Sequence, residues 1–120
     1  MVNNKYKTKD SGKRTSFVSG MVRDVQEDKA RFEFLIPLGQ KYEDALITRW
    51  AMLMTRGADK YGDRNWEKAN GVEEMNRFKS SAFRHFMQWF CDEDDEDHAA
   101  AVLFNINGYE YVKEKLNEKS

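Results

Sequence analysis

Apolar residues spaced three and four positions apart dominate the second half of this 120-residue chain. The clearest run extends from Val72 to Asp92. Its apolar side chains recur at Met75, Phe78, Ala82, Phe86 and Trp89. This spacing places them on one face of an α-helix. An apolar stripe of that length must pack against another element, so the chain is constrained to a packed helical domain.

Two further segments have the same periodicity. The first, Leu38 to Arg56, stops at Gly57, which would serve as its C-cap. The last follows an acidic block, with Asp94 or Asp95 as its N-cap, and runs to about Asn117. Because no segment alternates convincingly with period two, the sequence predicts an all-α fold, an antiparallel bundle of three long helices.

The front of the chain has a different composition. Residues 1–16 hold five Lys or Arg and a single acid, with few apolar side chains. We therefore predict a flexible basic arm at 1–16 and a single helical domain at 17–120. The arm is either a disordered terminus or a segment that touches an anionic partner. Between the first two helices, residues 58–71 should form a structured loop, because a tryptophan such as Trp66 in a glycine-containing loop usually packs against another part of the protein.

Composition also bounds location and partners. The net charge is −1, which gives no reason to expect a nucleic-acid partner. No apolar run has the length of a membrane span, and the N-terminus lacks a signal-peptide pattern, so we expect a cytoplasmic protein without a membrane partner. The helices carry more aromatic residues than three helices readily cover. We therefore expect oligomerisation, as a homodimer or homotetramer, to complete the fold.

The most unusual local feature is an acidic block. Six consecutive carboxylates run from Asp92 to Asp97, and His98 follows them. Bound Mg²⁺ or Mn²⁺ would relieve their mutual repulsion, because such ions prefer oxygen ligands. The simpler interpretation is a solvated surface whose acids interact favourably with the N-terminus of the next helix.

Polar residues share faces with this block at helical spacing. On the last helix, Asp94, Asp97 and Asn105 form a stripe beside His98. Glu43 lies on an otherwise apolar face of the first helix. The second helix carries a polar stripe of Ser81, His85, Gln88 and Asp92, flanked by Lys79 and Arg84. These surfaces could converge on one inward-facing site.

Each of these residues also has a structural interpretation. A structural role with its hydrogen bonds satisfied explains either histidine equally well. A hydrogen bond to a neighbouring helix would explain Asn105. Lys79 and Arg84 can be surface charges. The two histidines and one cysteine do not form a recognised zinc spacing.

Three segments together indicate a family. Gly57–Trp66 reads GADKYGDRNW, Phe83–Trp89 reads FRHFMQW, and the DEDH of 95–98 precedes Asn105. These residues resemble the phage-type dATP/dGTP diphosphohydrolases, which are similar to the MazG-like all-α nucleoside triphosphate pyrophosphatases. The resemblance covers roughly Arg31 to Val112.

The resemblance implies an enzyme that hydrolyses dGTP and dATP between the α and β phosphates, giving the monophosphate and pyrophosphate. It also implies Mg²⁺ or Mn²⁺ as cofactor and, for a phage-encoded protein, action in the host cytoplasm. An acidic site can hold a strongly anionic triphosphate only through bridging cations, so the acidic block agrees with this chemistry.

The resemblance also suggests roles for individual residues. The expected metal ligands are Glu43, Glu93 and Asp97, followed by Asp94 and Glu96. The expected catalytic residues are Glu43, Glu93, Asp97 and His85. The expected nucleotide contacts are Lys60, Lys79, Arg84 and His85 at the phosphates, Asn65 and Trp66 at the base, and His98 and Asn105. The chain departs from the usual E-x-x-E and E-x-x-D pair of all-α pyrophosphatases, since only Glu93-x-x-Glu96 and the overlapping Asp94-x-x-Asp97 are present.

Two functions without turnover remain as alternatives. One is a helical interaction protein, such as a phage-encoded inhibitor or adaptor, with the acidic block as its recognition surface. The other is a nucleotide-binding sensor that keeps the pocket without turnover. Metal dependence separates the first from an enzyme, and release of pyrophosphate separates the second.

Overall fold

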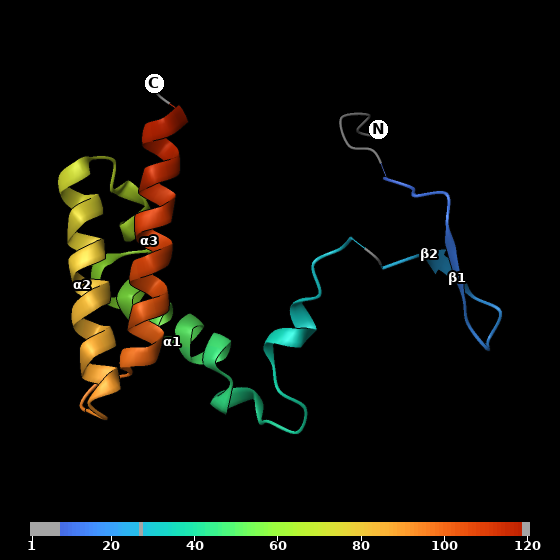
Figure 1. The fold of residues 1–120 in the computed structure, drawn as a ribbon, viewed down its shortest axis with the longest axis horizontal. Coiled ribbons are helices and arrows are strands. Elements are labelled where there is room, and N and C mark those ends of the chain that lie inside the picture. Colours follow the sequence, from blue (N-terminus) through green and yellow to red (C-terminus); the bar gives the residue numbers. More distant parts are fainter. Residues whose placement is uncertain (1–7, 27, 119–120) are drawn as a thin grey trace. The chain divides into compact units, whose positions relative to one another are not determined.

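The computed structural model describes residues 8–26 and 28–118. Contacts divide the chain into two compact units, Met1–Phe32 and Glu33–Ser120. The described part of the second unit contains three α-helices, α1 (Leu46–Tyr61), α2 (Val72–Phe90) and α3 (His98–Glu118) (Figure 1). Short 3₁₀ helices are η1 (Phe32–Leu35), η2 (Tyr42–Asp44) and η3 (Asn65–Lys68). The predicted fold class is confirmed, with helices making up most of the regular structure. None of the described helices is both long enough and apolar enough to cross a membrane.

α2 and α3 lie side by side and antiparallel, and α1 packs against α3 (Figure 1). The contact between α2 and α3 is close at Gly108. A Cβ at that position would lie 2.6 Å from the ring of Phe78, and this ring stands edge-on to Phe104 with the centroids 5.8 Å apart. Close packing of the two helices therefore explains a glycine in the middle of α3.

The bounds of α1 differ from the predicted ones. Its start is displaced to Leu46, since the preceding residues form the separate turn η2. The helix continues through Gly57, and Gly62 is the C-cap, with φ of 96° and its N–H donated to the carbonyl of Ala58. Gly62 adopts a conformation that side chains disfavour, whereas Gly57 is helical. Residues 58–61, predicted as loop, are therefore helical.

The connection between α2 and α3 contains the acidic block. α2 agrees with its predicted bounds to within two residues at its C-terminal end. The N-cap of α3 is Asp97 rather than Asp94 or Asp95, because Asp97 Oδ1 accepts a hydrogen bond from the N–H of Ala100 at 3.2 Å. Asp92, with φ of 60°, turns the chain away from α2.

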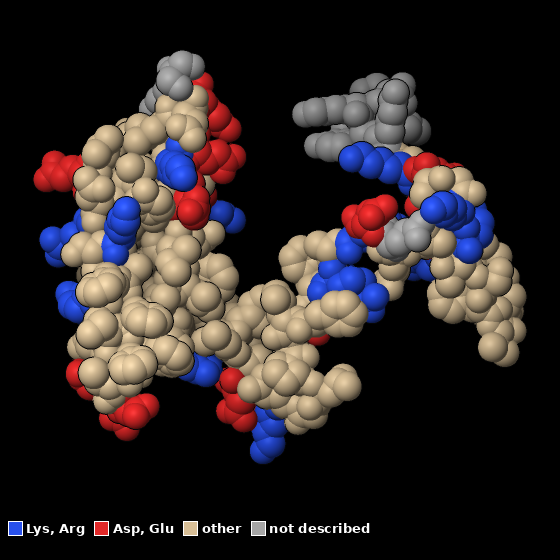
Figure 2. Space-filling view, viewed as in Figure 1, with Lys and Arg blue, Asp and Glu red and all other residues tan. Residues whose placement is uncertain are grey.

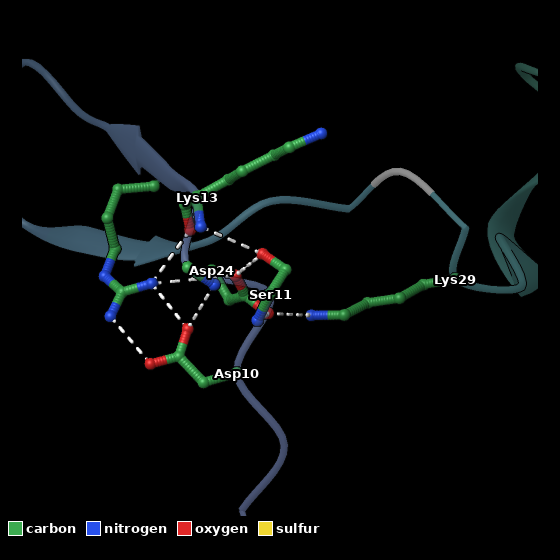
Figure 3. Close-up of polar contacts among 7 residues, drawn as sticks. Asp10, Ser11, Lys13, Asp24 and Lys29 are labelled. Atoms are coloured by element: carbon green, nitrogen blue, oxygen red, sulfur yellow. Dashed lines mark hydrogen bonds and ion pairs between the residues drawn. The ribbon is translucent and has the colours of Figure 1, made fainter.

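The first unit contains a hairpin that the sequence pattern did not indicate. β1 (Arg14–Ser16) pairs antiparallel with β2 (Val22–Asp24), with Arg14 opposite Asp24. Polar contacts join the two strands and the chain before them (Figure 3). Asp24 accepts hydrogen bonds from Ser11, and its Oδ2 lies 3.6 Å from Lys29 Nζ. Such a polar hairpin needs no apolar alternation, which explains why it was missed.

The predicted division at residue 16 stays a prediction. Its residues 1–7, with Lys5 and Lys7, lie outside the described part of the chain. In the described part, Asp10 accepts two hydrogen bonds from the guanidinium of Arg14 at 2.7 and 2.9 Å. These bonds, with one from the N–H of Gly12, lower the pKa of Asp10 to about 2.

Candidate functional site

A cavity of about 1160 Å³ adjoins the second half of α1, the η3 segment and the first turns of α2. Its volume is sufficient for a ligand of nucleotide size. The lining combines cations with aromatic rings and acids. The cations are Arg56, Lys60, Arg64, Lys68 and Arg77, the aromatic residues are Tyr61, Trp66, Phe78 and Phe104, and the acids are Asp59, Asp63, Glu74 and Glu96.

The η3 segment is fixed to α3 by Trp66 and by a lysine. The Trp66 ring meets Tyr111 at 5.2 Å and Phe104 at 6.2 Å between centroids, both in edge arrangements. Lys115 Nζ donates to the carbonyls of Glu67 and Ala69, each at 2.8 Å. The prediction that Trp66 packs against another part of the protein is confirmed, and its partners belong to α3. No local sequence pattern indicated Lys115.

Two buried histidines meet where α2 ends and α3 begins. The side chains of His85 and His98 are joined by an Nδ1–Nδ1 hydrogen bond of 2.8 Å, and the residues are 8% and 2% exposed. His98 Nε2 lies 2.8 Å from Asp95 Oδ1. An ionised Asp95 can only accept a hydrogen bond, so we assign a proton to Nε2 of His98. Its Nδ1 then accepts a hydrogen bond from the Nδ1–H of His85.

Electrostatics favour a neutral imidazole at His85. Burial lowers the pKa of His85, and the neighbouring charge of Arg84 lowers it further. The hydrogen bond from His98 holds the pKa of Asp95 below its usual range. A neutral imidazole beside a carboxylate is the form in which histidine binds metals.

Two sets of ligand-bearing side chains surround His98. The first is His85, Glu96 and His98, and the second is Glu93, Asp95 and His98. In each set, one ligand atom of every residue lies within 4.8 Å of the others. Glu96 also lines the cavity. Glu96 therefore belongs to the acidic block and also lines the same cavity as Asn65 and Trp66, the two residues predicted to contact the base.

Asp97 has a different environment from the one predicted for a metal ligand. Its two carboxylate oxygens accept hydrogen bonds from Nε and Nη2 of Arg49, each at 2.8 Å. This ion pair lowers the pKa of Asp97. Because both oxygens face a guanidinium and one also caps α3, coordination of a metal by Asp97 would compete with existing bonds.

Glu43 is also placed differently. It lies in η2 before α1 begins, rather than on the predicted apolar face of the first helix, and it is exposed. Glu43 and Asp94 belong to neither set of ligand-bearing side chains in the described residues. The structure therefore brings Glu93 and Glu96 close to His98, but it does not bring Glu43 or Asp94 into these sets.

The predicted nucleotide contacts separate into two groups. Lys60, Asn65 and Trp66 line the cavity, whereas Lys79, Arg84, His85, His98 and Asn105 do not. Lys79 lies over the ring of Tyr109, 5.4 Å from its centroid. Asn105 is buried and donates to the carbonyl of Ala101 at 2.8 Å, a structural bond within α3.

Several site residues were missed by sequence reasoning. The cavity cations Arg56, Arg64, Lys68 and Arg77 were not singled out, nor was Arg49. Arg56 and Lys60 are four residues apart on α1, a spacing that places them on one face. The predicted first helix ended at Arg56, so Lys60 was not recognised as a residue on the same helical face.

Together these features define a small, mostly helical domain with a cation-lined cavity beside an acidic and histidine-containing cluster. A family model described as dATP/dGTP diphosphohydrolase, N-terminal, matches residues 20–117. The match covers most of the chain, which therefore belongs to this family, as its motifs predicted. The family's name implies diphosphohydrolase activity on dATP and dGTP. No curated protein and no solved structure matches the chain.

Proposed function

We propose that the protein hydrolyses dGTP and dATP to the monophosphate and pyrophosphate in a metal-dependent reaction. The observation that carries the proposal is the position of Glu96. It lines the same cavity as Trp66 and five cations, and it also belongs, with two histidines, to a set of side chains that could hold a metal ion. Groups for base, phosphate and metal are thus neighbours. Family membership supports the same substrates.

Binding would use the two kinds of side chain in the cavity. Arg56 and Lys60, which line the cavity, would meet phosphate oxygens, because cations form charge-assisted hydrogen bonds with phosphates. Trp66 already uses edge contacts to Tyr111 and Phe104. Its ring provides an apolar surface for a purine, and the amide of Asn65 can pair with a base edge.

The donors near His98 fit a divalent cation. Glu93 and Glu96 are exposed carboxylates, and oxygen ligands suit Mg²⁺ or Mn²⁺. A bound cation would neutralise charge on the phosphates and on the leaving pyrophosphate. A carboxylate such as Glu93 would accept the proton of the attacking water. Asp97 fits this role less well, since Arg49 occupies both of its oxygens.

The direct test is incubation of the purified protein with each of the four dNTPs and Mg²⁺ or Mn²⁺, followed by separation of the products. We expect dGMP or dAMP with pyrophosphate, and no product when EDTA is present. Release of a diphosphate and orthophosphate would contradict the assigned bond. Binding of dGTP without turnover would indicate the sensor instead.

Three variants assign the roles. Trp66→Ala should raise KM more than it lowers kcat, because it removes base contact, whereas Glu96→Gln should chiefly lower kcat. Glu73→Gln is the matched control, since Glu73 is an exposed acid of α2 outside the cavity lining. It should leave both constants unchanged. Equal changes in kcat and KM for the first two variants would contradict this division of roles.

We also propose that the protein acts as a homodimer or homotetramer. Large apolar side chains of α2 remain exposed, notably Phe83 at 67%, Trp89 at 50% and Phe90 at 69%. Figure 2 shows broad uncharged areas on the helical unit. Surfaces of this kind usually mark association. Light scattering at micromolar concentration would test the proposal, and a monomer mass with full activity would contradict it.

A further inference from the structure

We propose that His85, His98 and Glu96 form a mixed nitrogen and oxygen metal site that prefers Zn²⁺, Co²⁺ or Mn²⁺ to Mg²⁺. The inference deepens the proposed function, because it concerns the metal of the same site. Its test uses the metal alone. Failure of metal binding is therefore distinguishable from failure of turnover.

The first argument is that ligand atoms from α2, from α3 and from the turn between them lie close together. His85 lies in the last turns of α2 and His98 is the first residue of α3, yet their Nδ1 atoms are 2.8 Å apart. A ligand atom of Glu96 lies within 4.8 Å of both histidines. Both imidazoles are buried, whereas Glu96 is exposed and lines the cavity. Three protein ligands beside an open cavity resemble catalytic metal sites, where a further position is left for water or substrate.

The second argument is the orientation of His98. Asp95 Oδ1 lies 2.8 Å from its Nε2 and accepts a hydrogen bond from Nε2–H, so the lone pair on His98 Nδ1 points toward His85. Metal-binding histidines commonly have such a carboxylate on the other nitrogen, which fixes the tautomer and raises the basicity of the ligand. His98 is thus prepared to bind through Nδ1.

His85 must change its tautomer when a metal binds. Without metal, its Nδ1–H donates to His98. Coordination by both Nδ1 atoms requires that proton to leave Nδ1 and an equivalent proton to be taken up at Nε2, so His85 stays neutral and no net proton is released. Nε2 lies 3.4 Å from Nη2 of Arg84, which is exposed. Because a guanidinium cannot accept a hydrogen bond, Arg84 opposes metal binding.

The alternative set, Glu93, Asp95 and His98, is a weaker candidate. It offers one nitrogen, and its Asp95 is already bonded to His98 Nε2. Mg²⁺ strongly prefers oxygen ligands in near-octahedral geometry. Imidazole nitrogen instead suits divalent transition metals, with affinity that rises from Mn²⁺ to Co²⁺ and Zn²⁺. Two converging imidazoles therefore predict the metal preference as well as the position.

The experiment is titration of the metal-free, full-length protein with Zn²⁺, Co²⁺, Mn²⁺ or Mg²⁺, each alone, by calorimetry. NMR of the imidazole nitrogens supplies a direct readout with Zn²⁺, because the chain has only two histidines. We expect one Zn²⁺ per chain and movement of both Nδ1 signals. Mg²⁺ should bind more weakly than the other three metals and leave the Nδ1 signals in place.

Exposed variants keep the test independent of folding. Glu96→Gln should weaken Zn²⁺ binding by about tenfold or more. Asp92→Asn removes the same charge from the same acidic block, at a left-handed residue where Asn is tolerated, and should change affinity by less than about twofold. Arg84→Met should tighten binding, since it removes the opposing donor.

Three results would overturn the proposal. The first is Zn²⁺ binding without movement of the Nδ1 signals. The second is equal weakening by Glu96→Gln and Asp92→Asn, which would indicate a diffuse acidic surface. The third is loss of binding on Glu93→Gln alone, which would assign the metal to the other set. Zn²⁺ binding as expected with no hydrolysis of dGTP would uphold this site and contradict only the proposed function.

Discussion

The hairpin unit and the helical unit are held by different kinds of contact. None of the residues 8–26 is buried, and the hairpin depends on exposed polar bonds such as those of Asp10 and Asp24 (Figure 3). The helical unit has a close contact at Gly108, a buried histidine pair and a partly buried ion pair between Arg49 and Asp97. Exposed ion pairs contribute only about 0–1 kcal/mol, whereas disruption of a packed core costs several times more.

This difference explains where the candidate site lies. Groups that must be placed within a fraction of an ångström need neighbours that hold them, and the helical unit supplies these neighbours. Changes in the helical unit should therefore shift the stability of that unit by the larger amount. Changes in the hairpin should remain local.

The largest effect should come from the contact between α2 and α3. Gly108→Ala would place a Cβ 2.6 Å from the Phe78 ring, which is itself packed against Phe104. We expect a loss of about 1–3 kcal/mol in the free energy of unfolding, measured by urea denaturation. Gly57→Ala is the control. Apart from its chain neighbours and the helix backbone, no atom of the described residues lies within 4 Å of its added Cβ, so it should stabilise by up to about 1 kcal/mol. Stabilisation by both variants would show that the Phe78 contact is not restrictive.

The next effect should come from Asp97. Asp97→Ala removes the N-cap of α3 and the partner of Arg49, and we expect a loss of about 1–2 kcal/mol. Asp97→Asn keeps a capping oxygen and should cost less. The difference should appear in both denaturant midpoint and melting temperature. If Ala and Asn are equally well tolerated, the cap contributes little.

The same ion pair predicts a pH dependence. Arg49 holds the pKa of Asp97 below the ordinary 3.8. A carboxyl whose pKa is lower in the folded state stabilises the protein above its unfolded pKa, and this contribution is lost as pH falls through the folded pKa. Melting temperatures between pH 6 and pH 2 should therefore fall less steeply at the acid end for Asp97→Asn than for the wild type. Asp94→Asn, a neighbouring acid outside this ion pair, should follow the wild type.

A smaller effect should come from the hairpin turn. Gly20 has φ of 91°, and its N–H donates to the carbonyl of Phe17 at 2.9 Å. Gly20→Ala strains this turn by about 1–2 kcal/mol, which should accelerate amide exchange in β1 and β2. The unfolding midpoint of the helical unit should shift by less than about 0.5 kcal/mol. A larger shift would show that the two units are energetically coupled.

The smallest effect should be seen in the titration of a single carboxyl group, that of Asp10. Asp10 should titrate with a pKa of about 2, because Arg14 bonds both of its oxygens. The chemical shift of its carboxyl carbon, followed by NMR as the pH is lowered, should therefore show a midpoint below the ordinary pKa of 3.8. The contribution of the Asp10–Arg14 pair to the stability of the hairpin unit is complete above pH 3.8 and is lost as the pH falls through 2. Arg14→Gln should return the midpoint toward 3.8. An unchanged midpoint would exclude Arg14 as the principal cause.

The sequence predicted what depends on local repetition. The apolar spacing of Val72–Asp92 was sufficient for α2, and the motifs around Gly57–Trp66 and Phe83–Trp89 were sufficient for the family. The C-terminal end of α1 was misplaced because Gly57 and Gly62 are both glycines with C-cap potential. Only the backbone conformation separates them, helical at Gly57 and φ of 96° at Gly62.

The sequence by itself determined the helical class, the course of α2 and the presence of an acidic block near a histidine, because each follows from neighbours along the chain. Only the tertiary structure decided which partner each acid has. Asp97 meets Arg49 from 48 residues earlier, and His98 meets His85 across the turn between α2 and α3. Glu96 reaches a cavity built largely by α1 and η3. These pairings depend on how the helices pack, since residues distant in sequence become neighbours only when their helical faces come together.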